Sequence, residues 1–359
     1  MSIFSHIQTA LRPACSRLLA PLKGLVWMAA ACLMLVGTAC VREEQLSDTP
    51  SDNFEALWKI IDEQYCFLQY KQEAIGLDWD AVHERYRQRI SPAMSRTQLF
   101  EVLAAMLAEL RDGHVNLYAA HDLGRNWSWY EDYPPNFYAD LQDAYFGTDY
   151  RIAASMRYRI LPDNIGYVAC PSFASAMGEG NLDELFWYLR TCNGLILDLR
   201  DNSGGDLVNA ERLAARFTNG RLHVGYICHK NGRAHNAFSK PEPEYLEPST
   251  GVRWQKRAIV LTNRHCYSAA NTFVRDVKCC PLVIVVGDQT GGGSGMPFSS
   301  ELPNGWSVRF SACPMFDTQL RHIEFGIQPD IAVALTESDR ARGRDTLIET
   351  ARQLLSSPE

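Results

Sequence analysis

The sequence of 359 residues predicts an α/β protein preceded by a helical region. Between residues 165 and 286, short runs of aliphatic residues alternate with helical patterns, which is typical of a parallel sheet covered by helices. Between residues 52 and 110, apolar residues recur at intervals of three and four, which is typical of amphipathic helices. The composition, with 46% hydrophobic and 21% charged residues, is that of a folded globular protein.

The helical region is expected at residues 52–117. Asp52 is a candidate N-cap for a first helix, residues 80–90 predict a second, and residues 95–110 predict a third with one apolar stripe. Residues 118–159 are rich in Trp, Tyr, Asp and Asn, and we expect them to form a long connecting loop that could line a cleft.

The α/β domain is expected at residues 160–359, and its elements follow in regular order. The predicted strands cover residues 165–169, 195–200, 258–262 and 282–286, and the predicted helices cover residues 180–191, 207–217 and 269–278.

Residues 1–39 combine basic residues with a following apolar run, which is the pattern of a secretory signal. The residues before Cys40 are Gly37, Thr38 and Ala39, and this site resembles a bacterial lipobox, although Gly37 replaces the usual leucine. The resemblance implies cleavage before Cys40, a lipid that anchors its thiol to a membrane, and a tether at residues 40–51. An uncleaved transmembrane anchor is the alternative. We therefore expect an exported protein in a bacterial cell envelope, in the periplasm or at the outer-membrane surface.

Charge and cysteine content exclude several classes of protein. The net charge of -7 argues against a general nucleic-acid binder. The nine histidines show no metal-ligand spacing, and Cys279-Cys280 has no nearby histidine, so no metal or organic cofactor is indicated. Eight cysteines follow Cys40, and export would permit disulfides whose pairing the sequence does not give.

A glycine-containing turn follows the strand at 195–200. Asp198-Leu-Arg-Asp-Asn-Ser-Gly-Gly-Asp206 brings Gly204 and Gly205 to a strand end, just before a helix. Free N–H groups at such a turn can bind an anion or an oxyanion. The alternative is a plain strand-to-helix turn.

Ser268 lies between a strand and the helix predicted at 269–278. A serine at a helix N-terminus has free amides and a positive dipole end beside it, which suits a nucleophile that generates an oxyanion. The alternative is a serine that only caps the helix, which is the commoner role for an isolated serine at this position. His265 and Cys266 are alternative reactive groups in the same segment.

His114 follows Asp112-Gly113 at the end of the third predicted helix. A histidine there can serve as a general base, or it can be purely structural.

These segments together match the motif order of a known family. The order is Asp-Gly-His, then Asp-Leu-Arg-Asp-Asn-Ser-Gly-Gly, then Asn-Arg-His-Cys-Tyr-Ser-Ala-Ala, then Glu324-Phe-Gly-Ile-Gln-Pro-Asp330. This resembles the tricorn and C-terminal processing peptidase family of serine peptidases, over roughly residues 52–335. The resemblance implies a crotonase/ClpP-like core of repeated strand-helix units.

The family has two catalytic arrangements. One uses a Ser-Lys dyad with a lysine about 25 residues after the serine; Gly293 stands there, and Lys278, the only lysine after Ser268, is expected to face elsewhere. The tricorn-like arrangement fits better. It implies that Ser268 is the nucleophile, His114 the general base and Glu324 the group that orients the base. Glu324 could also be a surface carboxylate.

The resemblance further implies an oxyanion hole made by Ala269 with Gly204 or Gly205. The tricorn pattern has a serine just before its histidine, and Gly113 replaces it here, which leaves open how the histidine is linked to the glutamate.

The segment between Leu117 and Ile160 is about half as long as a PDZ domain, so we expect that module to be absent. Peptide recognition would then fall to the helical region, to residues 127–150 and to the loop at 291–295. The function expected is that of a serine peptidase acting on a peptide or protein substrate. The alternatives are an inactive peptide-binding lipoprotein of the same fold and an esterase or amidase.

Overall fold

The computed structural model describes residues 47–127 and 133–357, which belong to one compact unit. No helix in this part of the chain is both long enough and apolar enough to cross a bilayer. The expected signal segment and Cys40 lie outside the described residues.

The larger sheet has seven strands in the order β13-β10-β9-β6-β5-β4-β3. Its strands are β3 (Arg151–Ala153), β4 (Met156–Ile160), β5 (Ile165–Ala169), β6 (Gly194–Asp198), β9 (Ala258–Thr262), β10 (Val283–Gly287) and β13 (Ile331–Ala332). The strands from β5 to β13 are parallel, and β3 and β4 are antiparallel. The carboxyl ends of β5, β6, β9 and β10 therefore meet at one edge of the sheet, where ligands bind in open α/β folds.

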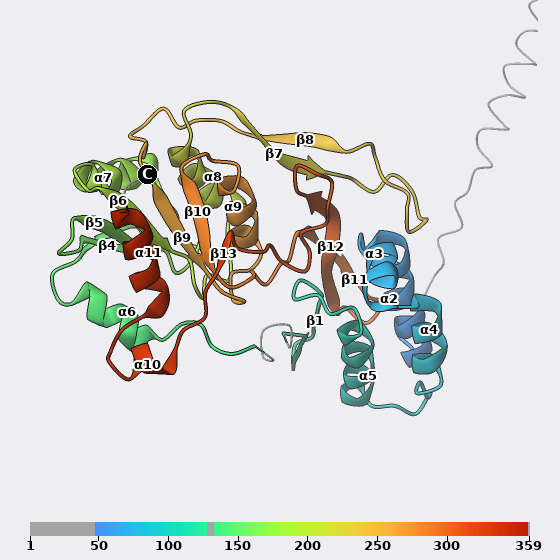
Figure 1. Cartoon of the computed structure of the whole chain (residues 1–359). Coiled ribbons are helices and arrows are strands. Elements are labelled where there is room, and N and C mark those ends of the chain that lie inside the picture. The colour runs from blue at the N-terminus through green and yellow to red at the C-terminus, as the bar shows by residue number, and fades with distance from the viewer. Residues whose placement is uncertain (1–46, 128–132, 358–359) are drawn as a thin grey trace, which may run out of the picture. The chain divides into compact units, whose positions relative to one another are not determined.

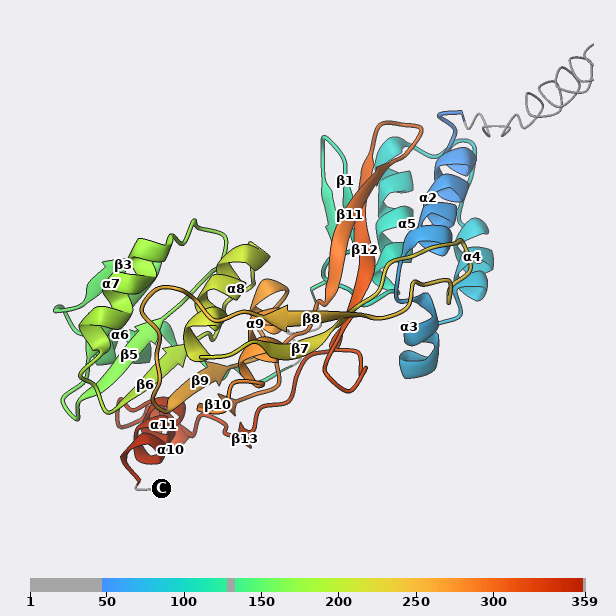
Figure 2. The ribbon, with the colours of Figure 1, turned by 90° about the horizontal axis from the view of Figure 1, so that it is seen from above.

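Helices cover both faces of this sheet (Figure 1, Figure 2). One face packs against α7 (Glu179–Leu189), α8 (Leu207–Ala214) and α9 (Ala269–Val277), and the other packs against α6 (Ala139–Phe146) and α11 (Thr346–Ser356). Short helices follow α8 at η2 (Ala215–Phe217) and precede α11 at α10 (Glu337–Arg340). These elements confirm the predicted α/β class.

A second sheet was not predicted. Its main strand order is β2-β1-β12-β7-β8, with β11 paired to β12. The strands are β1 (Asn116–Tyr118), β2 (Leu123–Arg125), β7 (Leu222–Ile227), β8 (Glu242–Leu246), β11 (Gly295–Glu301) and β12 (Ser307–Phe316). Because β12 pairs with β1 and with β7, it connects the segment after His114 to the α/β domain.

From residue 47 onward, the helical region contains α2 (Pro50–Gln64), α3 (Leu68–Ile75), α4 (Trp79–Arg87) and α5 (Arg96–Ala108). Their apolar side chains share one core with Val308 and Phe310 of β12. The helical region therefore depends on a strand that lies some 200 residues later in the chain.

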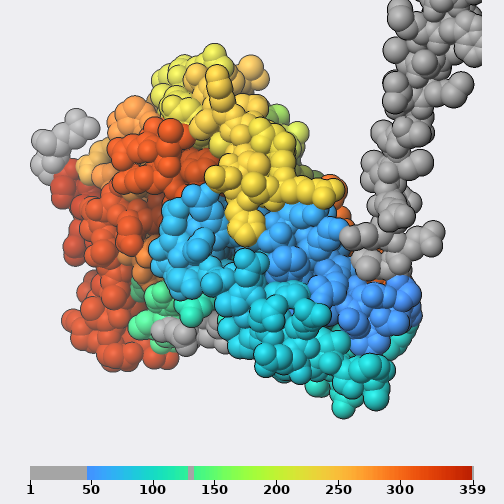
Figure 3. Space-filling view, turned by 90° about the vertical axis from the view of Figure 1, so that its right-hand side faces the viewer, coloured from blue at the N-terminus to red at the C-terminus, as the bar shows by residue number. Residues whose placement is uncertain are grey.

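The segment between β7 and β8 also contacts the helical region. His235 Nε2 lies 2.7 Å from Asp62 Oδ1, and Arg233 lies 3.5 Å from Glu63. Figure 3 shows this segment, in yellow, against the blue helices.

Two local expectations were wrong. Thr49 rather than Asp52 is the N-cap of α2, because its hydroxyl accepts the Asp52 N–H; α2 begins at Pro50, so the expected tether ends earlier. The expected loop at 118–159 contains β2, α6, β3 and β4. Tertiary contacts stabilise these short elements: the Phe146 ring of α6 stacks on Tyr167 of β5 at 4.7 Å.

Candidate active site

Ser268 lies at the junction between the segment that follows β9 and helix α9. Its backbone has φ 58° and ψ -122°, which is a strained conformation for a residue with a Cβ atom. Ser268 occupies the N-cap position of α9, but its side chain makes no capping hydrogen bond, so its hydroxyl does not serve as a helix cap. The strained turn presents the hydroxyl at the carboxyl edge of the sheet.

His114 meets that hydroxyl from a distant part of the chain. Its Nε2 lies 3.0 Å from Ser268 Oγ, although the residues are 154 positions apart. The imidazole is only 5% exposed and lies against the Tyr267 ring, with centroids 5.0 Å apart. The turn is fixed by Asp112, whose Oδ1 accepts the His114 backbone N–H at 2.8 Å.

The electrostatic environment keeps His114 in its neutral form. Burial lowers the pKa of the imidazole below its ordinary 6.5, the Asp112 charge opposes that shift, and the Arg309 charge adds to it. A neutral imidazole can accept a proton from a hydroxyl. The Gly295 carbonyl lies beside the ring and favours its charged form, but buried Nδ1 forms no hydrogen bond of good geometry to a described residue.

Asp112 is the ionised carboxylate beside this base. Besides the His114 amide, it accepts hydrogen bonds from Tyr65, Tyr267 and Ser311 hydroxyls. Although burial opposes ionisation, the Lys71 charge and the hydrogen bonds from the His114 amide and the Ser311 hydroxyl hold the pKa of Asp112 below its usual 3.8. A carboxylate with several donors stays charged even when buried.

Glu324 is buried near this cluster, at 3% exposure, so it is not a surface carboxylate. Its Oε1 lies 3.1 Å from Lys71 Nζ, and its Oε2 accepts the Ser294 N–H at 2.9 Å. Among the described residues it forms no hydrogen bond with His114. Burial and the Asp112 charge raise the pKa of Glu324 to about 7, against the effect of Lys71.

The three residues assigned to the oxyanion hole differ in what their amides do. The Gly204 N–H already donates to Asn202 Oδ1 at 2.9 Å. Neither Gly205 nor Ala269 donates its N–H to a described residue. Gly204 has φ +98°, and a Cβ on it would lie 2.9 Å from the Ala269 nitrogen, so this glycine serves close packing of the two turns.

A cavity of about 470 Å³, the site cavity, opens above Ser268 and His114. Its walls combine the nucleophile turn, the glycine turn and the second sheet, and it is lined by Gly113, His114, Asn116, Tyr118, Leu123, Arg125, Trp127, Asp201, Ser203, Gly205, His265, Tyr267, Ser268 and Arg309. This volume is in the range of small-ligand pockets, and its open side would admit a peptide segment.

His265 and Cys266, the alternative reactive groups, are less well placed for catalysis than His114 and Ser268. Burial raises the pKa of Cys266, and its Sγ lies 3.0 Å from the Leu199 carbonyl, so it is an inert buried thiol. The other seven described cysteines, from Cys66 to Cys313, are also free thiols. His265 lines the site cavity, where its Nδ1 lies 2.9 Å from Asp201 Oδ1.

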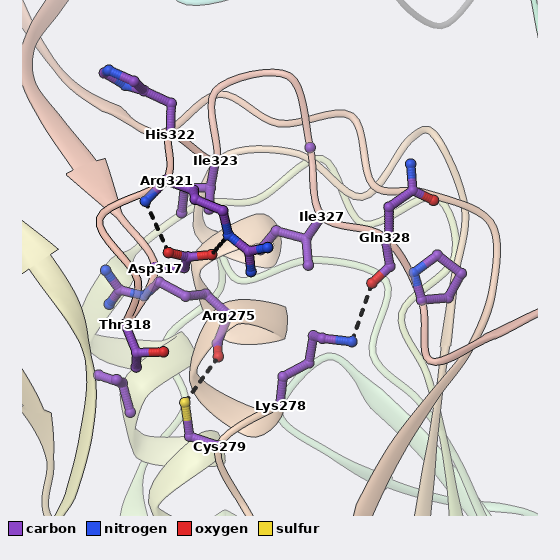
Figure 4. A pocket seen from close by; sticks show the side chains of 13 residues that line it. Arg275, Lys278, Cys279, Asp317, Thr318, Arg321, His322, Ile323, Ile327 and Gln328 are labelled. Carbon is purple, nitrogen blue, oxygen red and sulfur yellow. Dashed lines mark hydrogen bonds and ion pairs between the residues drawn. The ribbon is translucent and has the colours of Figure 1, made fainter.

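Lys278 faces away from Ser268, as expected. It lines a second hollow of about 450 Å³, where it bonds to the Gln328 carbonyl (Figure 4). It also pairs with Asp330. Arg275 and Arg321 line the same hollow and pair with Glu244 and Asp317, so these cations already have counter-charges.

Comparison with known proteins assigns the family. The model of peptidase family S41 matches residues 164–333, and that of the tricorn protease C1 domain matches residues 48–108. A crystal structure from Parabacteroides merdae ATCC 43184, provisionally described as a peptidase, is 53% identical, with a TM-score of 0.82 over 87% of this chain and 98% of that one. The chain belongs to peptidase family S41.

Other S41 relatives are more distant. The curated Tricorn-like protease C-terminal subunit of Sulfurisphaera tokodaii is 29% identical over 53% of this chain, and the tricorn protease homolog of Saccharolobus solfataricus is 27% identical over a similar share. The matched region spans only 21% and 16% of those proteins. Mature CPAF complexed with lactacystin shares the S41 fold, with a TM-score of 0.65 at 12% identity over 86% of this chain and 97% of that one.

Several site residues were missed at the sequence level. Lys71 lies in α3, a helix that was not predicted separately, and Arg125 and Arg309 lie in unpredicted strands. Asp112 had one usable signal, since it stands two residues before His114 in a segment already selected for its chemistry.

Proposed function

We propose that this S41 member is a serine peptidase that hydrolyses peptide bonds through an acyl-enzyme, with Ser268 as nucleophile and His114 as general base. The observation that carries the proposal is the 3.0 Å contact between His114 Nε2 and Ser268 Oγ inside the site cavity. A serine hydroxyl needs such a base, because it is a weak nucleophile at neutral pH.

In the first step, Ser268 Oγ attacks the substrate carbonyl carbon and its proton passes to His114 Nε2. The amides of Ala269 and Gly205 bind the tetrahedral oxyanion. This assignment is supported because neither N–H donates to a described residue and because Ala269 begins helix α9, whose N-terminus favours negative charge. Gly204 is less suitable, because Asn202 already accepts its N–H. His114 then protonates the leaving amine, and water hydrolyses the acyl-enzyme by the reverse sequence.

The imidazolium formed in this step needs a negative charge nearby. Asp112 supplies the nearer one, since its charge favours protonated His114 and its Oδ1 fixes the histidine backbone. Glu324 remains our proposed orienting carboxylate, acting through the buried cluster that it shares with Asp112 and Lys71. Its ion pair with Lys71 supports a role in balancing the charge of the buried cluster.

Covalent labelling tests the proposal. A fluorophosphonate probe should add one mass increment to the peptide that carries Ser268, and Ser268→Ala should remove it. Ser203→Ala is the matched control, because Ser203 lines the same cavity but lies on the glycine turn. A folded wild-type protein that stays unlabelled would overturn the proposal and favour a non-catalytic peptide-binding protein.

We also propose that the protein is exported and carries a lipid on Cys40, which anchors it in a bacterial cell envelope. The support is the basic and apolar leader followed by the Gly-Thr-Ala-Cys site. Metabolic labelling with an alkyne fatty acid should mark the wild type and Cys32→Ala, but not Cys40→Ala. Peptides upstream of Cys40 in the purified protein would contradict cleavage and indicate an uncleaved anchor.

A further inference from the structure

A row of polar side chains crosses the second sheet next to the catalytic pair. Asn116 of β1 lies directly opposite Arg309 of β12 on one side and Arg125 of β2 on the other. Directly opposite residues of antiparallel strands point to the same face. All three line the site cavity, together with His114 and Ser268.

The other face of these strands is apolar. Val308 and Phe310, the neighbours of Arg309 in β12, are fully buried in the core of the helical region. The alternation of side chains along the strand therefore fixes Arg309 on the cavity side.

Neither arginine has a counter-charge among the described residues. Arg309 is half-buried and takes part in no ion pair there, and Arg125 packs its guanidinium over the Trp127 ring at 4.2 Å. Three buried arginines behave differently, since Arg200, Arg216 and Arg275 each pair with two carboxylates. Arg125 and Arg309, separated by strand β1, are two cations without a counter-charge among the described residues, and they leave one wall of the cavity positive.

Asp201, an acidic residue that also lines the cavity, is not a counter-charge for Arg309 or Arg125. Asp201 lines the cavity but pairs with His265 at 2.9 Å and accepts from Asn263 at 2.7 Å. The position of Arg309 is also unfavourable for the base, because its charge opposes protonation of His114. An anionic group of the substrate that binds to Arg309 would explain why a cation lies at this position.

We infer that Arg309, assisted by Arg125, binds a carboxylate of the peptide substrate close to the scissile bond. The carboxylate could be an Asp or Glu side chain or the free C-terminus of the peptide. A guanidinium offers a planar pair of donors that matches a carboxylate. The inference rests on the proposed peptidase function and adds the substrate class.

The test compares matched peptides. Cleavage sites are first mapped by mass spectrometry after digestion of a peptide library. Peptides are then made in pairs, with Asp or Glu against Asn or Gln at the flanking positions, and with a free against an amidated C-terminus. We expect kcat/KM to be about 10- to 100-fold higher for the acidic member of one pair type, as for the loss of a hydrogen bond to a charged group. The pair type that responds identifies the source of the carboxylate.

Variants then assign the preference to the arginine row. Arg309→Gln should remove most of the acid preference, Arg309→Lys should keep part of it, and Arg125→Gln should weaken it. Arg253→Gln is the matched control, because Arg253 is exposed, has no ion pair among the described residues and lies outside the cavity. An acid preference that survives in Arg309→Gln, or a wild type with none, would overturn the inference.

Two readouts separate this inference from the peptidase proposal. Labelling by an uncharged fluorophosphonate reports on Ser268 and His114 without any carboxylate, so a loss of acid preference in an Arg309→Gln protein that is still labelled concerns the carboxylate site alone. If the wild type is not labelled, the peptidase proposal fails. Fluorescence anisotropy with the same peptide pairs then decides: carboxylate-dependent binding that Arg309→Gln removes supports the site, and its absence overturns it.

Discussion

His114→Ala should reduce the rate of acylation of Ser268 by about 10⁴- to 10⁶-fold, the range seen when a base acting as a unit with its serine is removed. The reason is geometric: Nε2 of His114 is the group placed 3.0 Å from the nucleophile. The measurement is the second-order rate constant of fluorophosphonate labelling, with folding checked by circular dichroism.

His265→Ala is the matched control for this variant. His265 lines the same cavity but pairs with Asp201, so its loss should change the rate less than about 10-fold. An equal loss in both variants would contradict the assignment of the base.

The pH profile of wild-type labelling gives an independent check on the same group. Because burial lowers the pKa of His114 below 6.5, the neutral form persists to more acidic pH and the acid limb should have its midpoint below 6.5. A midpoint above that value would mean that another group limits the reaction.

Lys71→Met should destabilise the protein by about 3–5 kcal/mol, the cost of leaving a buried charge without its partner. The Lys71 side chain is fully buried and bonds to Glu324 Oε1 and to the Arg111 carbonyl, and its charge favours ionised Asp112. Urea denaturation of the variant and the wild type gives the difference. Lys240→Met, at an exposed lysine, should change the free energy of unfolding by less than about 0.5 kcal/mol.

The effect should also depend on pH. Glu324 has a folded-state pKa of about 7 against an ordinary 4.5, so its contribution is most favourable below pH 4.5 and is lost as the pH rises through 7. Removing Lys71 raises that pKa further, so the loss in Lys71→Met should be larger at pH 8 than at pH 6. A second variant, Lys71→Met with Glu324→Gln, should be less unstable than the sum of the two single changes. Strict additivity would contradict the ion pair.

The elements of the larger sheet could be predicted because each carries its own local signal. Residues 258–262 are a continuous aliphatic run, and the structure has β9 at Ala258–Thr262. The second sheet carries no comparable signal. In β12, alternation is broken where Phe310 and Ser311 are both buried, because the strand changes partners along its length.

The site was predictable where motif and chemistry coincide in a short segment. Ser268 and His114 each had an alternative structural interpretation from the sequence, and the 3.0 Å contact between them removes it. Lys71 and Arg309 could not be found in this way. Each is a single cation in an ordinary helix or strand, and its meaning arises from residues more than 190 positions away.

The order in which the chain is synthesised has a consequence for when the site can exist. The helical region needs Val308 and Phe310 for its core, and Arg200 of the glycine turn needs Asp345, which pairs with it at 2.8 Å just before α11. Segments synthesised early therefore complete their packing only when later segments are available, and His114 can contact Ser268 only after both have left the ribosome. A chain synthesised only as far as β11 lacks the strand on which the helical region packs, so we expect the site to assemble late in synthesis.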